Sequence, residues 1–233
     1  MGVAYVQKGT GKDLLLLHGY LSSKEAFAAQ VAYFSKFYKV TAIDFLGFGH
    51  SRCLTNAFSV GDYAIWLRDV MRVLNVQKPH VIAHSFGCRV AVKLASEDAD
   101  AFDKMILTGP AGVILHRGLS YRCKVKTYRL VKKLFPAFAE RKFGSAEYKT
   151  LSPVMKESYK KIVNEDLRCC ARKVQNKVRI VQGNRDKVTT MAEAEAYLCA
   201  FKNAELKIID GGHFAFAENP IAFHLLVEEF LYD

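Results

Sequence analysis

The stretch Pro79–Gly87 reads PHVIAHSFG and decides the fold. An apolar run typical of a strand ends abruptly in a turn of small, polar and aromatic residues, and a helical pattern follows over 89–96. A serine on such a turn projects its hydroxyl beyond the sheet, and the small residues Ala83 and Gly87 let strand and helix approach closely. We therefore interpret Ser85 as the candidate nucleophile of a strand–turn–helix elbow.

A serine hydroxyl is a weak nucleophile, so it needs a histidine base, an acid that orients the base, and hydrogen-bond donors for an oxyanion. Residues 204–210 have the pattern of a strand, and a Gly-Gly loop after it presents His213. Residues 178–182 have the pattern of another strand, and the turn after it carries Asp186. We predict that His213 is the base and that Asp186 orients it.

The oxyanion donors are also predicted from residues that directly follow a strand. Residues 13–17 form an apolar strand pattern, and His18, Gly19 and Tyr20 turn away from its end. We predict the backbone N–H groups of Tyr20 and Phe86 as the oxyanion hole, because the residue after the nucleophile turns its amide toward the substrate. His18 and Gly19 support this loop, and the side chains of Tyr20 and Phe86 are expected to flank the cavity entrance.

The candidate residues occur along the chain in the order Ser85, Asp186, His213. This order is typical of one protein family and differs from the orders found in the other common serine triads. The chain resembles the α/β hydrolases over nearly its whole length. It departs from the family at Ala83 and Cys88, where glycine is usual. The matching segments are His18–Gly19, the loop Asp44–Ser51, the Ser85 elbow, Asp186 and Gly212–His213.

The resemblance implies an α/β fold with a mostly parallel central sheet, helices on both faces and a helical lid. The residue pattern agrees, and 1–233 reads as a single domain interrupted by a lid insertion at 111–173. Strands are predicted at Val3–Gln7, Leu14–Leu17, Lys39–Asp44, His80–Ala83, Lys104–Thr108, Lys177–Gln182 and Glu205–Asp210. Helices are predicted at Lys24–Lys36, Val60–Leu74, Cys88–Ser96, Met191–Ala200 and Pro220–Leu231.

The lid segment 111–173 is strongly cationic and rich in aromatic residues. It contains 16 of the 34 Lys and Arg and 5 of the 23 Asp and Glu, so it accounts for the whole net charge of +11. Two readings stay open: the lysines form solvated helix faces, or they steer an anionic substrate into the pocket. Docking on lipid or nucleic acid is less favoured, since no nucleic-acid motif is present.

The cysteine spacing and the apolar runs indicate which cofactors and which location to expect. The six cysteines are scattered without Cys-x-x-Cys spacing, so we expect no metal and no organic cofactor; the redox state of Cys169 and Cys170 stays open. The first residues lack a signal-peptide pattern and no apolar run is long enough to span a membrane, so we expect a cytoplasmic protein without stable membrane insertion. The oligomeric state is left open.

Together these patterns predict a serine hydrolase of the carboxylesterase type. It would cleave small esters or related acyl compounds through Ser85, His213 and Asp186 and an acyl-enzyme. Two alternatives remain. The first is C–C bond hydrolysis or a lyase-type reaction on an anionic substrate. The second is a ligand-binding protein that keeps the fold without turnover.

Overall fold

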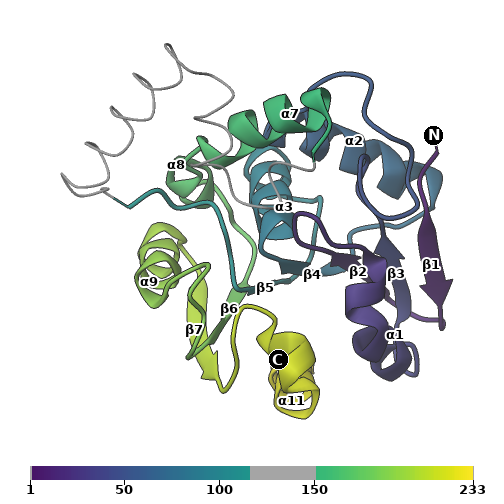
Figure 1. The fold of residues 1–233 in the computed structure, drawn as a ribbon. Coiled ribbons are helices and arrows are strands. Elements are labelled where there is room, and N and C mark those ends of the chain that lie inside the picture. Colours follow the sequence, from purple (N-terminus) through teal and green to yellow (C-terminus); the bar gives the residue numbers. More distant parts are fainter. Residues whose placement is uncertain (1, 116–150, 233) are drawn as a thin grey trace.

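The computed structural model describes residues 2–115 and 151–232, and within them a seven-stranded sheet forms the centre (Figure 1). The strand order is β1-β3-β2-β4-β5-β6-β7; β1 is antiparallel to β3 and the other pairs are parallel. The strands are β1 Tyr5–Lys8, β2 Asp13–Leu17, β3 Lys39–Ile43, β4 His80–His84, β5 Met105–Thr108, β6 Val178–Gly183 and β7 Ala204–Ile209. All seven predicted strands are therefore confirmed, with shifts of one or two residues at their ends.

Helices cover both faces of the sheet. They are η1 Lys24–Phe27, α1 Ala28–Phe34, α2 Val60–Val73, α3 Phe86–Glu97, α7 Pro153–Val163, α8 Arg168–Ala171, α9 Met191–Ala200, α10 Ala215–Glu218 and α11 Pro220–Tyr232. One predicted helix differs, because 24–36 divides into the short 3-10 helix η1 and the α-helix α1. Such 3-10 turns are common at helix N-termini, and here Asp44 accepts hydrogen bonds from both the backbone and the ammonium group of Lys24.

Two apolar cores lie on opposite sides of the sheet, because successive side chains of a strand point to opposite faces. In β2, Leu15 and Leu17 pack in the core beneath α2, α3 and α9. Leu14 and Leu16 pack in the core beneath α1 and α11, and Figure 1 shows these two helices together on one side of the sheet. All four leucines are buried, as expected for a parallel sheet covered on both faces.

The strand that leads to Asp186 is anchored to the last helix by a buried arginine. Arg179 of β6 is 1% exposed and donates to Glu205 of β7 at 2.7 Å and to Glu229 of α11 at 3.1 Å. Its guanidinium also donates to the carbonyl of Leu226 in α11. These contacts hold β6, β7 and α11 in one arrangement, and the turns after β6 and β7 carry Asp186 and His213.

The lid segment 111–173 falls partly outside the described residues, since 116–150 is not described. Of the remainder, α7 begins at Pro153, behind the N-cap Ser152, whose hydroxyl accepts from the amide of Met155. The Ser158 hydroxyl of α7 donates to the carbonyl of Phe58 at 2.7 Å. No helix in the described ranges is long and apolar enough to cross a membrane.

Helix and sheet approach each other closely at Gly87 in the first turn of α3. A Cβ added there would lie 2.3 Å from the carbonyl oxygen of Leu17 and 2.9 Å from that of His18. Glycine therefore lets α3 begin directly above the end of β2, which fixes where the residues of the elbow lie.

We predict that Gly87→Ala lowers the free energy of unfolding by about 1–3 kcal/mol, because the new methyl group overlaps backbone that cannot move aside alone. Gly61→Ala in α2 is the matched control. The nearest atom to its Cβ would be the Lys93 side chain at 3.6 Å, so its stability should stay equal or rise by up to about 1 kcal/mol. Urea unfolding of both variants measures this, and equal effects would contradict the proposed steric constraint.

Candidate active site

Three loops meet at one edge of the sheet because the carboxyl ends of parallel strands lie on the same side. Ser85 directly follows β4, Asp186 lies in the turn after β6, and His213 lies in the loop after β7. Ser85 and His213 both line a cavity of about 550 Å³. Asp186 lies behind His213, with its side chain fully buried.

Ser85 has a strained backbone, with φ 49° and ψ −106°. A positive φ is rare for a residue with a side chain, and such strain costs about 1–3 kcal/mol. Strand β5 and helix α3 hold the conformation: the Ser85 amide donates to the carbonyl of Thr108 at 3.2 Å, and the Ser85 carbonyl accepts from the Cys88 amide at 3.1 Å. The turn thus presents the hydroxyl at the cavity rather than within the sheet.

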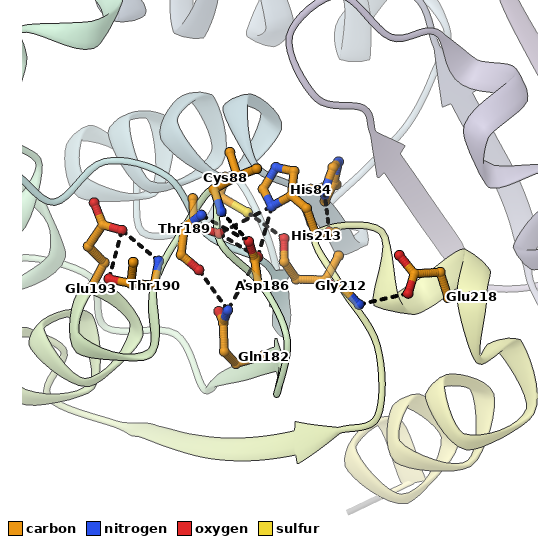
Figure 2. Close-up of polar contacts among 12 residues, drawn as sticks. His84, Cys88, Gln182, Asp186, Thr189, Thr190, Glu193, Gly212, His213 and Glu218 are labelled. Carbon is orange, nitrogen blue, oxygen red and sulfur yellow. Dashed lines mark hydrogen bonds and ion pairs between the residues drawn. The ribbon is translucent and has the colours of Figure 1, made fainter.

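The imidazole of His213 is oriented by Asp186 (Figure 2). His213 Nδ1 lies 2.8 Å from Asp186 Oδ2, so the Nδ1–H group donates to the carboxylate and the neutral ring keeps a free lone pair on Nε2. Among the described residues no hydrogen bond joins His213 to Ser85, although both reach the same cavity. Such bonds are often long before substrate binds.

The carboxylate of Asp186 is saturated with hydrogen bonds. Its Oδ1 accepts from the amides of Val188 at 2.8 Å and Thr189 at 3.0 Å, and its Oδ2 accepts from the Thr189 hydroxyl at 2.8 Å as well as from His213. Burial alone would raise the pKa of Asp186, but the bonds to His213, Val188 and Thr189 outweigh it and lower the pKa to about 2. The acid is therefore ionised throughout the neutral range.

His84 is a residue of this site that sequence analysis did not identify. Its ring centroid is 4.7 Å from that of His213, and its Nε2–H group donates to the His213 carbonyl at 3.0 Å. The side chain is 1% exposed, and burial lowers the pKa of His84 to about 3, so the ring is neutral. A neutral, buried ring can support the His213 loop without adding a competing positive charge.

The predicted oxyanion loop lies beside the serine. A Cβ on Gly19 would approach the Ser85 Cβ to 3.4 Å, so the loop passes close to the elbow. Phe86 is the first residue of α3, where an amide has no partner within the helix. His18 is buried, and its Nδ1–H group donates to the Gly19 carbonyl at 2.7 Å while Nε2 accepts from the Phe45 amide at 3.0 Å.

The two aromatic side chains at this loop take different positions. Tyr20 lines the cavity, contacts the ring of Tyr159 in α7 at a centroid distance of 5.2 Å, and donates to the Met155 carbonyl at 3.3 Å. Phe86 is only 2% exposed and packs edge-on against Tyr63. Phe86 is nevertheless among the residues that line the cavity, while its ring packs into the core, so its predicted place at the entrance stays a prediction.

A second group of residues, separate from Asp186 and His213, has the spacing of metal ligands, but its carboxylates are already paired with a lysine. Glu25, Asp44 and His50 bring ligand atoms within 4.8 Å of one another. The Lys24 ammonium group lies 2.7 Å from Glu25 and 3.0 Å from Asp44. Because this cation is already paired with both carboxylates, we assign no metal to the group.

Two further neighbours of the acid–base pair were missed. Gly109 has φ 50°, and a Cβ there would lie 3.2 Å from both Asp186 Oδ2 and His213 Nδ1, so only glycine leaves room for the pair. Gln182 donates to Asp186 Oδ2 at 3.3 Å and to the Thr189 carbonyl at 2.8 Å. The available signal for Gly109 was its place directly after β5, beside the elbow strand.

From the lowered pKa of Asp186 we predict how the free energy of unfolding depends on pH. An acid whose pKa is lower in the folded state stabilises the fold above its unfolded pKa of about 4, and this contribution disappears as the pH falls through about 2. Asp186→Asn should therefore lower the free energy of unfolding by about 2 kcal/mol at pH 7 and progressively less below about pH 5.

Urea unfolding of wild type and variant across this pH range measures the effect. Asp210→Asn is the control, because Asp210 pairs with Arg185 at the surface and its removal should change stability by less than about 1 kcal/mol. If Asp186→Asn lowers the free energy of unfolding by the same amount at every pH, the role given to the ionised carboxylate is contradicted.

Comparisons with known proteins agree with the fold. Over 261 aligned positions the chain is 24% identical to an uncharacterized protein of Mycobacterium tuberculosis, covering 96% of this chain and 76% of that one. Over 106 residues it is 30% identical to (E)-2-((N-methylformamido)methylene)succinate hydrolase of Acinetobacter baylyi, covering 45% of this chain and 40% of that enzyme. The enol-lactonase of Burkholderia xenovorans superposes with a TM-score of 0.77 at 24% identity, covering 99% and 96% of the two chains.

A family model described as the alpha/beta hydrolase fold matches residues 13–141. This range includes the oxyanion loop, the elbow and α3, and it extends over more than half of the chain. The strand order, the elbow at the end of β4 and the loops after β6 and β7 are consistent with the match. The chain belongs to the alpha/beta hydrolase fold family.

Proposed function

We propose that this protein is a serine hydrolase that cleaves small carboxylic esters or related acyl compounds. The observation that carries the proposal is the Asp186–His213 pair, whose ring reaches the same cavity as the strained Ser85. An imidazole held by a buried carboxylate, with a half-buried serine hydroxyl in the same cavity, is the arrangement that serine acyl transfer requires.

In the proposed reaction, His213 Nε2 takes the proton of Ser85 as its oxygen attacks the substrate carbonyl. The amides of Tyr20 and Phe86 stabilise the oxyanion, which is worth roughly 10²–10³ in kcat per donor. His213 then gives the proton to the leaving group, whose departure leaves the acyl group bonded to Ser85. Water activated by the same imidazole attacks this acyl-enzyme and releases the acid and free Ser85.

We predict that Ser85→Ala abolishes hydrolysis of p-nitrophenyl acetate and butyrate and also abolishes labelling by a fluorophosphonate. The reason is that both reactions need the same oxygen nucleophile. Ser96→Ala is the matched control, because its hydroxyl lies on the same helix and donates to the Lys93 carbonyl away from the cavity. Absorbance assays and labelling of the same samples measure both effects.

The same samples test the two alternatives. Labelling of Ser85 without ester turnover would favour C–C bond hydrolysis or a lyase-type reaction on an anionic substrate. Neither labelling nor turnover in the folded wild type would contradict the hydrolase proposal and favour a ligand-binding protein. Full activity in Ser85→Ala would exclude Ser85 as the nucleophile.

The anionic substrate and the cytoplasmic location also stay proposals. We propose that the cationic lid segment 111–173 attracts carboxylate-bearing substrates. Its described part contributes Lys156, Lys160 and Lys161 on α7. If the lid acts by long-range attraction, kcat/KM for an anionic ester should fall between low salt and about 1 M salt, where the Debye length is about 3 Å. An unchanged kcat/KM would leave the lysines as a solvated surface.

A further inference from the structure

Arg89 places a buried positive charge in the wall of the cavity. It lies on α3, four residues after Ser85, and lines the cavity while being only 8% exposed. Its Nη1 donates to the carbonyls of Ile162 and Glu165, both at 2.9 Å. These two bonds tie α3 to the end of α7 and fix the guanidinium group at the cavity.

The charge of Arg89 has no carboxylate partner among the described residues. Glu165 bonds Arg89 only through its carbonyl, because its side chain is paired with Lys93 at 3.2 Å and attracts the guanidinium group only from a distance. Glu193 also lines the cavity, but its carboxylate accepts from the amide and the hydroxyl of Thr190 at the start of α9. Removing a cation from water without an anion beside it is costly, which makes an unpaired buried arginine unusual.

The two carbonyl bonds account for only one nitrogen of the guanidinium group. Arginine has five N–H donors, so Nε and Nη2 retain three. None of these three has a partner within the described residues. Burial lowers the pKa of Arg89, yet a guanidinium group stays protonated at neutral pH. The cavity wall therefore holds a permanent cation with donors to spare, and this planar fork suits a carboxylate.

The position of Arg89 relative to Ser85 indicates which part of a substrate it would meet. Four residues along a helix correspond to a rise of about 6 Å. His213 must face the leaving group to return its proton, which leaves the acyl group on the side of α3 and α7. The cavity lining also includes apolar side chains, among them Val113 and Ile162.

We propose that Arg89 binds a carboxylate at the far end of the acyl group, so that the preferred substrates are half-esters of short dicarboxylic acids. This inference rests on the proposed function of Ser85. The cation would select the substrate through a charge-assisted hydrogen bond, and the apolar side chains of the lining would hold the few methylene groups between carboxylate and ester. A purely structural clamp would need only the bonds to Ile162 and Glu165.

The test compares mono-p-nitrophenyl glutarate with p-nitrophenyl valerate, which have acyl chains of equal length ending in a carboxylate or a methyl group. At about 1 M salt, attraction by exposed lid lysines is screened, whereas a buried contact persists. Wild type should prefer the glutarate ester in kcat/KM by at least about tenfold. Arg89→Gln keeps a donor for the α7 carbonyls but loses the charge, and should lower this ratio about 10- to 100-fold.

Two further variants make the comparison specific. Arg89→Lys keeps the charge without the planar fork and should retain part of the preference. Lys93→Gln removes an equal charge one turn further along α3 from a residue that contacts Glu165 but does not line the cavity, so the ratio should stay within about twofold. Equal losses with both esters in Arg89→Gln, at an unchanged ratio, would overturn the inference and leave the hydrolase proposal intact.

A binding readout separates this inference from the proposed function. Glutaramate and valeramide are amides with acyl chains of equal length that end in a carboxylate and a methyl group. Glutaramate should raise the Tm of wild type more than valeramide does, and the difference should vanish in Arg89→Gln. If wild type hydrolyses neither ester but shows this difference, the hydrolase proposal fails and the carboxylate site stands. If glutaramate and valeramide shift the wild-type Tm equally, Arg89 does not bind a carboxylate.

Discussion

The contact between the first turn of α3 and the end of β2 is the constraint on which the candidate site depends. Gly87 lies against the Leu17 carbonyl, so the elbow and the loop that follows β2 must occupy the same small space. This proximity brings Gly19 beside Ser85 and leaves the Phe86 amide at the start of a helix. A larger residue at position 87 would separate the elements that carry the nucleophile and its predicted oxyanion donors.

The two charged side chains of the site, Asp186 and Arg89, differ in how fully their charges are compensated. On one side, the Asp186 carboxylate accepts hydrogen bonds on both oxygens, and the buried His84 beside its partner is neutral. On the other, Arg89 bonds two carbonyls, and within the part of the chain that the structure describes no carboxylate contacts it. Electrostatic interactions are stronger in the cavity wall, where the dielectric constant is low. The hydrogen bonds therefore keep Asp186 ionised, whereas compensation of the charge of Arg89 depends on an anion that enters the cavity.

Residues that follow strands were predictable, whereas residues that depend on contacts between distant elements were not. Ser85, Asp186 and His213 each follow a recognisable strand, and parallel strands bring such positions to one edge without further information. Arg89 reads as an ordinary helical residue, because its environment is set by carbonyls more than 70 positions later in the chain. The inward turn of Phe86 likewise depends on packing against Tyr63, which no local pattern encodes.

The connection between α7 and the body of the protein is made largely through main-chain carbonyls. Tyr20 donates to the carbonyl of Met155, Arg89 donates to those of Ile162 and Glu165, and in return Ser158 donates to that of Phe58. Carbonyl acceptors are present whatever side chain a position carries. Cavity-facing side chains of α7 can therefore be exchanged during evolution while most of its anchors persist, so the preference for one acyl group can drift without rebuilding the reacting centre.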